Sequence, residues 1–339
     1  MRPYLSRTSL FVTAFRICYV RPLGTSNGAL GDTEMLRFAI RWCSIFTIAF
    51  CGIVAFAEDV FEVAGASQPG RRPLCIMRAD GSDLRLLADL GTGRYSGSPR
   101  FSSDGQSIVF DVWIAATDKN AAAAMVYTIG VDGKGLKKIC KGSMPTWAPG
   151  DRQLTFFRHG RDFGLWVIGK DGSGLERLNE NGNSPRWSPD GKRMAFIRLG
   201  GTGGLAIYNP KTGSDHVILQ KAAAFSPRHG FDWSPDGKRL CVQCRTSKFE
   251  ILFVDPSTGE SSVRYRGAPG HSLSWSPDGN TILMWKAKKL DAINQLHFLA
   301  VDSEEPPRVV PGQPTNRDNT DPSWSPDGKW IAFTSGLAE

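Results

Sequence analysis

Short apolar runs recur along most of the chain, and turn-forming residues separate them. Ile108–Phe110, Met194–Phe196 and Ile331–Phe333 are three such runs, with Gly, Pro, Asn, Asp and Ser frequent in the stretches between. Runs this short, bounded by turn residues and rich in β-branched and aromatic residues, are typical of buried strands. The pattern therefore predicts an all-β fold over residues 74–335.

One turn motif, an aromatic residue followed by Ser-Pro-Asp-Gly, precedes these runs at regular intervals. Intact copies are Trp187–Gly191, Trp233–Gly237, Trp275–Gly279 and Trp324–Gly328, and degenerate copies are Phe101–Gly105 and Trp147–Asp151. Pro presets φ at the second turn position, Asp tolerates the third, and Gly takes the left-handed position that closes a hairpin. We call the leading aromatic residues the anchors, and we expect them to be core residues that pack between neighbouring repeats. The six anchors are Phe101, Trp147, Trp187, Trp233, Trp275 and Trp324.

A second hairpin lies between successive anchors. In one repeat, Leu165–Ile168 leads into the turn Lys170–Gly174 and then into Leu175–Leu178. Each repeat thus holds four antiparallel strands, and the anchors lie 40 to 49 residues apart, which is the size of a propeller blade. Six anchors and six second hairpins predict a six-bladed β-propeller.

The order of the hairpins predicts how the ring closes. The propeller begins with a second hairpin, Leu74–Leu87, and ends with a first one, Asp321–Phe333. Residues 74–90 and 321–335 should therefore share one blade, because this pairing removes the exposed sheet edges of an open ring.

The segment before the propeller has the pattern of an export signal. Residues 35–57 combine the basic residues Arg37 and Arg41, the apolar stretch Cys43–Phe56 and a small-x-small cleavage site before Glu58. The apolar stretch is shorter than the roughly 20 residues of a membrane-spanning helix. We expect cleavage, no stable membrane span afterwards, and a periplasmic or secreted protein; an uncleaved anchor is the alternative.

We further expect translation to begin at Met35. Residues 1–34 show no clear periodicity and would form an upstream extension or a disordered segment, and residues 58–73 would form a linker.

Charge argues against nucleic-acid binding. The chain carries a formal net charge of +8, but residues 1–57 hold six Arg against two acidic residues. The remaining part is only weakly basic, and it contains neither a Lys/Arg run nor an RNA-binding aromatic motif.

Four cysteines, Cys75, Cys140, Cys241 and Cys244, follow the signal. Cys241 and Cys244 have the spacing of a redox motif, but Cys241 belongs to a predicted strand, where residues three apart point to opposite faces. We therefore expect a buried thiol at Cys241, no metal site and no cofactor. A disulfide among the four stays open, because exported proteins can form one.

The candidate site lies on the face opposite the hairpin turns, because function on a rigid scaffold concentrates in irregular loops. The candidates are the basic residues and histidines of those loops: Arg158, His159, Arg161, His229, Arg245, His271, Lys286, Lys288, Lys289 and Arg317. His229 and His271 each stand four residues before an anchor, so both should lie near the mouth of the central channel. The set would bind an anionic ligand or a partner; alternatively, its members are solvated loop charges and ordinary histidines.

The sequence contains no convincing catalytic set. Metal binding by His159, His229 and His271 lacks the tight spacing of a ligand group, although imidazole is a common ligand.

The repeat resembles that of the TolB-type propeller. The shared pattern is Ser-Pro-x-Trp-Ser-Pro-Asp-Gly-Lys-x-Ile-Ala-Phe, with Asp321–Phe333 and Ser184–Phe196 as the nearest copies, and the resemblance covers nearly the whole chain after residue 73. It implies a propeller that docks a protein of the cell envelope. TolB carries an α/β domain before its propeller, whereas only residues 58–73 separate the predicted signal from the first strand here. Related repeats occur in oligopeptidases and in some polysaccharide lyases.

Three functions are compatible with these observations. The first is an exported, monomeric, non-catalytic interaction module with an envelope protein as partner. The second is a lyase of anionic glycans that uses basic and His residues on the loop face, and the third is a sensory or substrate-gating propeller. Clustering of His159, His229 and His271 with arginines in one pocket would favour the enzyme, whereas a broad basic and aromatic face would favour the binding module.

Overall fold

The computed structural model describes residues 70–114, 123–200, 203–220, 226–245, 249–267, 269–287 and 293–337. The chain divides into two units, Met1–Gly52 and Ile53–Glu339, and all described residues belong to the second. Residues 1–69 lie outside the described residues. The upstream segment 1–34, the signal 35–57 and most of the linker 58–73 therefore stay predictions.

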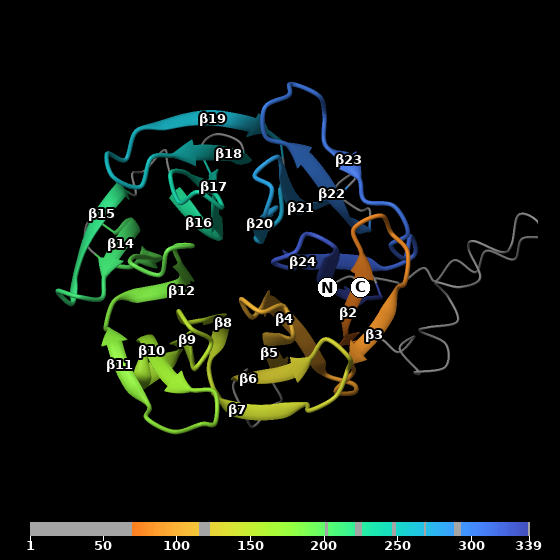
Figure 1. Ribbon diagram of the computed structural model, residues 1–339, viewed down its shortest axis with the longest axis horizontal. Coiled ribbons are helices and arrows are strands. Elements are labelled where there is room, and N and C mark those ends of the chain that lie inside the picture. Colours follow the sequence, from red (N-terminus) through yellow and green to blue (C-terminus); the bar gives the residue numbers. More distant parts are fainter. Residues whose placement is uncertain are drawn as a thin grey trace, which may run out of the picture. The chain divides into compact units, whose positions relative to one another are not determined.

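The described residues form a ring of six β-sheets, each of which is one blade (Figure 1). Blade 1 contains β4 (Arg94–Phe101), β5 (Ser107–Ile114), β6 (Ala123–Gly130) and β7 (Lys137–Lys141). Blade 2 contains β8 (Ser143–Trp147), β9 (Gln153–Arg158), β10 (Gly164–Gly169) and β11 (Glu176–Asn179). Blade 3 contains β12 (Gly182–Trp187), β13 (Met194–Arg198), β14 (Gly204–Asn209) and β15 (Ser214–Gln220).

The remaining blades repeat this order. Blade 4 contains β16 (Ser226–Trp233), β17 (Leu240–Arg245), β18 (Phe249–Val254) and β19 (Ser261–Arg266). Blade 5 contains β20 (Leu273–Trp275), β21 (Thr281–Ala287), β22 (Asn294–Ala300) and β23 (Arg308–Val309). Blade 6 contains β24 (Asp318–Trp324), β25 (Trp330–Gly336), β2 (Leu74–Arg78) and β3 (Arg85–Ala88). The four strands of each blade are antiparallel, so the predicted six-bladed propeller is confirmed.

Blade 6 joins the two ends of the propeller. Strand β2 pairs with β25, with Cys75 opposite Phe333 and Ile76 opposite Ala332. This arrangement agrees with the closure that the hairpin order predicts. One element was not predicted: β1 (Arg71–Arg72), placed in the linker by the sequence, pairs in parallel with β4 as a fifth strand of its sheet.

The Ser-Pro-Asp-Gly turns are held by bonds within the motif itself. Ser188 Oγ donates to Asp190 Oδ1 at 2.6 Å, and the same oxygen accepts the backbone N–H of Lys192 at 3.0 Å. These bonds, with the serine hydroxyl first, lower the pKa of Asp190. Gly191 takes the left-handed conformation at φ +68°, as the turn requires.

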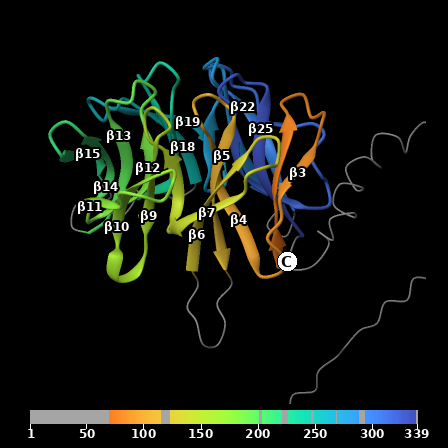
Figure 2. The same ribbon diagram turned by 60° about the horizontal axis from the view of Figure 1, so that its bottom comes forward.

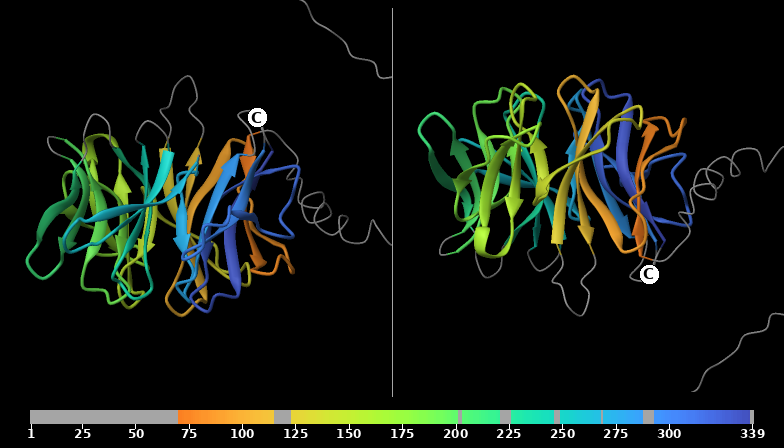
Figure 3. Two further views of the ribbon diagram at one scale, coloured as in Figure 1. Left: turned by 90° about the horizontal axis from the view of Figure 1, so that it is seen from above. Right: turned by 90° about the horizontal axis from the view of Figure 1, so that it is seen from below.

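Strand direction alternates within each blade, so the two faces of the ring carry different connections between strands. The innermost strands β4, β8, β12, β16, β20 and β24 end at the Ser-Pro-Asp-Gly turns, on what we call the turn face. Their starting ends lie on the opposite loop face (Figures 2 and 3). Both ends of the central channel are thus framed by the innermost strands.

The core consists of six apolar clusters, each shared by two neighbouring blades. Each cluster includes one anchor, so the predicted packing of the anchors between repeats is observed. Trp233 and Trp275 are buried, and the other four anchors are half-buried. The ring stacks of Trp275 on Phe253 and of Trp324 on Phe298 also cross from one blade to the preceding one.

Candidate functional site

A cavity of about 320 Å³ opens at the loop-face end of the channel. Five of the six blades contribute to its wall, mainly through the innermost strands. The wall contains Arg72, Tyr95, Ser96, Gly97, Ser98, Trp113, Met144, Arg186, His271, Ser272 and Asp321. The cavity combines aromatic rings, hydroxyl groups and charges of both signs.

A repeated bulge in the innermost strands shapes this wall. Ser98, Met144, Ser184 and Asp321 each stand three residues before an anchor, and each has a positive φ of 50° to 54°. The strand register shifts at the same places. Because a bulge re-aims the side chains of its strand, three of these four residues line the cavity.

One side of the cavity is aromatic. Tyr95 and Trp113 are direct partners in the β4–β5 ladder. The Trp113 ring meets His159 edge-on, with ring centroids 5.1 Å apart. On the other side of the cavity, His271 meets Trp285 edge-on at 5.6 Å. Aromatic rings held in this way give a rigid contact surface at little cost in side-chain entropy.

Two carboxyl groups lie at this wall: Asp321 lines the cavity, and Asp111 is buried next to it. Asp111 is fully buried, and one of its oxygens accepts the backbone N–H of Met144 at 2.7 Å. Burial raises the pKa of Asp111 to about 7, with the bond from Met144 opposing the rise and the neighbouring Asp321 adding to it. Burial also raises the pKa of Asp321. These two carboxyl groups therefore hold protons at higher pH than ordinary aspartates do.

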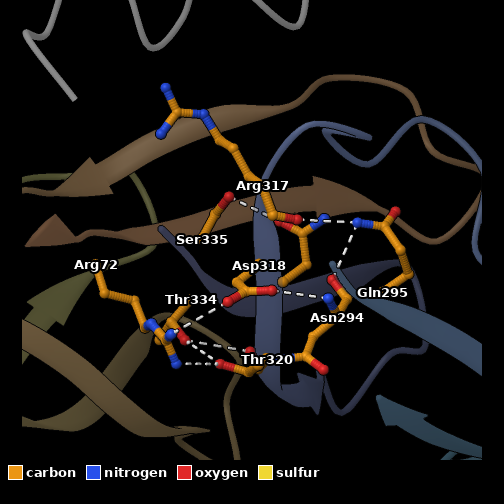
Figure 4. A network of polar contacts seen from close by, with 9 residues as sticks. Arg72, Asn294, Gln295, Arg317, Asp318, Thr320, Thr334 and Ser335 are labelled. Carbon is orange, nitrogen blue, oxygen red and sulfur yellow. Dashed lines mark hydrogen bonds and ion pairs between the residues drawn. The ribbon is translucent and has the colours of Figure 1, made fainter. Parts of the chain in front are cut away.

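Strand β1 contributes Arg72 to the cavity wall, and this side chain belongs to a network of polar contacts (Figure 4). Arg72 donates to Thr320 Oγ1 at 3.1 Å and lies 3.8 Å from a carboxylate oxygen of Asp318. The other oxygen of Asp318 accepts the backbone N–H of Asn294 at 2.7 Å. Strand β24 is thus tied both to β1 and to the neighbouring blade.

Of the ten residues predicted for the site, His271 is the one described residue that lines the cavity, and its side chain is exposed. His159 stands behind the wall: it contacts Trp113, and Ser143 Oγ lies 2.8 Å from its Nε2. Burial, and then the charge of Lys141, lowers the pKa of His159.

The predicted arginines have different environments. Arg158 donates to the backbone oxygen of Lys141 at 3.2 Å and lies over the Trp166 ring at 4.8 Å. Arg161 and Arg245 are exposed. Arg317 is buried, with 5% of its surface exposed, and burial lowers its pKa. Arg317 is therefore not the exposed loop charge that the sequence suggests.

The last predicted residues are only partly covered by the structure. Lys286 lies half-buried in β21. His229 belongs to β16, but its side chain, like the whole of Lys288 and Lys289, lies outside the described residues. Within the described part of the chain, the predicted set does not gather in one pocket. His159 and His271 do not line the same pocket, so these two histidines do not show the clustering that would favour an enzyme.

Sequence reasoning missed most of the cavity wall. Arg186 and Asp321 lie one and three residues before their anchors, inside segments taken only as strands leading to a turn. Polar residues recur one position before the anchors, at Arg100, Thr146, Arg186, Asp232, Ser274 and Ser323, and this was a signal for Arg186. The bulge that brings Asp321 into the wall has no such signal. Arg72 and Trp113 carry no such signal, because β1 and the end of β5 lie outside the repeat motif.

The cysteines are free thiols in the described structure, with no disulfide among Cys75, Cys140, Cys241 and Cys244. Cys241 and Cys244 belong to two different core clusters, so they point to opposite faces of their strand as predicted. Burial raises the pKa of Cys140 to about 11 and that of Cys244 to about 12. Thiols of this kind are poor nucleophiles at neutral pH.

Two further features are absent from the described residues. No group of three His, Cys, Asp or Glu side chains there has the arrangement of a metal site. No helix among the described residues has the length and apolar character needed to span a bilayer.

Comparison with known proteins relates the fold to TolB. No protein-family profile matches the chain. No curated protein matches it either. Among solved structures, a protein from Agrobacterium tumefaciens assigned as a TolB superposes with a TM-score of 0.61 at 16% identity, over 78% of this chain and 98% of that one. TolB from Acinetobacter baumannii superposes with a TM-score of 0.55 at 15% identity, over 85% of this chain and 70% of that one.

An oligogalacturonate lyase from Vibrio parahaemolyticus also superposes, at 12% identity over 74% of this chain and 80% of that one. Its TM-score is 0.48, which is too low to relate this chain to that lyase. The comparisons therefore establish that this chain has a TolB-like six-bladed propeller fold.

Proposed function

We propose that the protein is an exported, non-catalytic interaction module of the cell envelope, which binds a segment of a protein partner in the loop-face cavity. The observation that carries this proposal is the composition of the cavity wall. Trp113 and Tyr95 supply rigid aromatic surface, Ser96 and Ser272 supply hydrogen-bonding groups, and Arg72 supplies a charge. Aromatic residues and arginine dominate the energetically important parts of protein interfaces.

The size of the cavity supports a protruding segment as the ligand. A volume of about 320 Å³ accommodates inserted side chains of a partner. Export is part of the same proposal and rests on residues 35–57. The mature chain would start at Glu58 and act in the periplasm or after secretion.

The alternative proposal is a lyase of anionic glycans. It draws support from the basic side chains Arg72, Arg186 and His271 in the cavity wall, which could neutralise a sugar carboxylate. Asp321 in the same wall opposes this, because its carboxyl group would repel an anionic sugar when ionised.

The proposal is tested by capture from cell-envelope extract with three baits that start at Glu58. The first is the native sequence, the second carries Trp113→Ala and His271→Ala, and the third is a matched control with Lys134→Ser and Lys192→Ser. Both control residues lie on turns of the opposite face, with 87% and 72% of their side chains exposed. All three baits must first show equal melting temperatures.

We expect one defined protein to bind the native bait and the control, and to be lost from the cavity variant. The purified partner should then form a stoichiometric complex with the native protein. Retention by all three baits, or by none, contradicts the proposal. Release of unsaturated oligosaccharides from polygalacturonate, lost in the cavity variant, would favour the lyase instead.

A further inference from the structure

The channel has a second cavity at its turn-face end. Its volume is about 410 Å³, and the innermost strands and turns of five blades line it. Three of its charged residues, Arg100, Arg186 and Asp232, each stand one residue before an anchor. Asp151 and Asp190 line it from the turns. Arg186 also lines the loop-face cavity, so its side chain lies between the two.

Both arginines are deeply buried. Arg100 exposes 8% of its surface and Arg186 exposes 7%. Arg100 reaches across the channel to donate to the backbone oxygen of Leu273 at 3.3 Å, and Arg186 donates to the backbone oxygen of Pro185 at 2.8 Å. The Nε–H group of each has no hydrogen-bond partner in the described part of the chain.

Neither guanidinium is paired with a carboxylate. Among the described residues, no acidic oxygen lies within ion-pair distance of Arg100 or Arg186. Burial, and then the positive charge of Arg100, lowers the pKa of Arg186 to about 9. Asp232, Asp111 and Asp321 act in the opposite direction and offset this lowering only in part. Buried guanidinium groups with unpaired N–H groups are destabilising, so this pair of arginines favours a bound anion.

The three carboxylates of the cavity wall are engaged elsewhere. The Oδ2 atom of Asp232 accepts the backbone N–H of Trp275 at 2.9 Å. Asp151 accepts the backbone N–H of Ser103 at 2.7 Å, and Asp190 accepts the hydroxyl group of Ser188 at 2.6 Å. Burial raises the pKa of Asp111 to about 7, so this carboxyl group is only partly ionised near neutral pH, and burial also raises the pKa of Asp321. Asp232 on the same wall disfavours a dianion more strongly than a monoanion.

We propose that Arg100 and Arg186 form an oxyanion site in the turn-face cavity that binds one carboxylate group. The unpaired Nε–H groups and the planar guanidinium groups suit the two oxygens of a carboxylate. The carboxylate comes either from a free small acid or from an acidic side chain of a bound polypeptide. The site shares Arg186 with the proposed partner cavity, whereas Arg100 does not line that cavity. The Arg100 variant therefore tests this proposal without changing the partner cavity, and the two proposals can fail independently.

The test measures thermal unfolding of the protein starting at Glu58 in sodium acetate and in sodium chloride at equal ionic strength. Binding to the folded state stabilises it, so acetate should raise Tm by a few degrees, increasing with concentration. Arg100→Gln and Arg186→Gln should each abolish the rise. Arg152→Gln removes an exposed charge on the same face and should retain it.

Line broadening of ¹³C-acetate on adding the native protein provides a direct measurement that needs no variant to fold. A blocked pentapeptide with a central Glu, compared with its Gln counterpart, distinguishes the two sources of the carboxylate. Acetate binding alone supports a free acid, and binding of the Glu peptide but not the Gln peptide supports a polypeptide side chain. No broadening and no Tm difference in the native protein, or a Tm rise that persists in both Gln variants, overturns the proposal.

Discussion

Trp233 donates its indole Nε1–H to the backbone oxygen of Arg186, 3.0 Å away in the preceding blade. Trp147 makes the equivalent bond to the backbone oxygen of Arg100 at 3.1 Å. Two anchors of the repeat thus fix the backbone at the two buried arginines of the channel. The motif that builds the blades therefore also positions charged groups inside the ring.

Replacement of Trp233 by Ala should cost about 3–5 kcal/mol of unfolding free energy, because a large buried aromatic ring is lost from the interface between blades 3 and 4. Equilibrium denaturation measures the change. Leu136→Ala, at a site that is 47% exposed, serves as control and should change the free energy by less than about 0.5 kcal/mol. Equal effects of the two substitutions would mean that Trp233 is not an interblade core residue.

The glycines of the turns provide a matched pair of substitutions. Gly191 and Gly237 have almost the same φ, +68° and +69°, so a side chain at either should cost about 1–2 kcal/mol through backbone strain. A Cβ atom at Gly191 would also lie 2.8 Å from Cγ of Pro149, whereas at Gly237 the nearest atom, of Pro189, is 3.8 Å away. Gly191→Ala should therefore destabilise more than Gly237→Ala in denaturation experiments. The reverse order would show that the turns do not pack against one another as described.

Asp111 makes stability depend on pH. Its pKa rises from 3.8 to about 7 on folding, so the folded state binds the proton more tightly than the unfolded state. The associated stability is fully present below about pH 4 and is lost as pH rises through 7, by an amount on the order of a few kcal/mol. Asp111→Asn should reduce the loss of unfolding free energy between pH 4 and 8. The variant should be more stable than the native protein at pH 8. Identical pH profiles between pH 4 and 8 would contradict this assignment.

The four cysteines should resist modification in the folded protein. Brief alkylation at pH 7.5, followed by mass spectrometry, should leave Cys75, Cys241 and Cys244 unmodified, because burial raises their thiol pKa values. Cys140 is only partly buried and should react first. All four should react in denaturant. A pair that stays unreactive in denaturant until a reductant is added would indicate a disulfide.

The fold was predictable because the repeat is local. A Ser-Pro-Asp-Gly turn is specified by its own residues, as the bonds among Ser188, Asp190 and Lys192 illustrate, and six copies in register fix the number of blades. The closure of blade 6 followed from the order of the hairpins alone.

The site was less predictable because it depends on which residues face the channel. Asp321 faces it through a bulge whose positive φ no sequence pattern announced, and Arg72 reaches it through a two-residue strand. The loop charges gave a misleading signal in one case, since Arg317 is buried. His271 was predictable, because its spacing from the anchor placed it at the channel mouth.

Site-directed photo-crosslinking in the native host tests the central proposal most directly. A photoreactive amino acid is placed at His271, on the loop-face cavity, and separately at Lys192, on the turn face. The account predicts one defined protein adduct from position 271, no matching adduct from position 192, and loss of the adduct when Trp113→Ala is added. Folded protein that gives no adduct at position 271, or the same adduct at both positions, would contradict partner binding at the loop-face cavity.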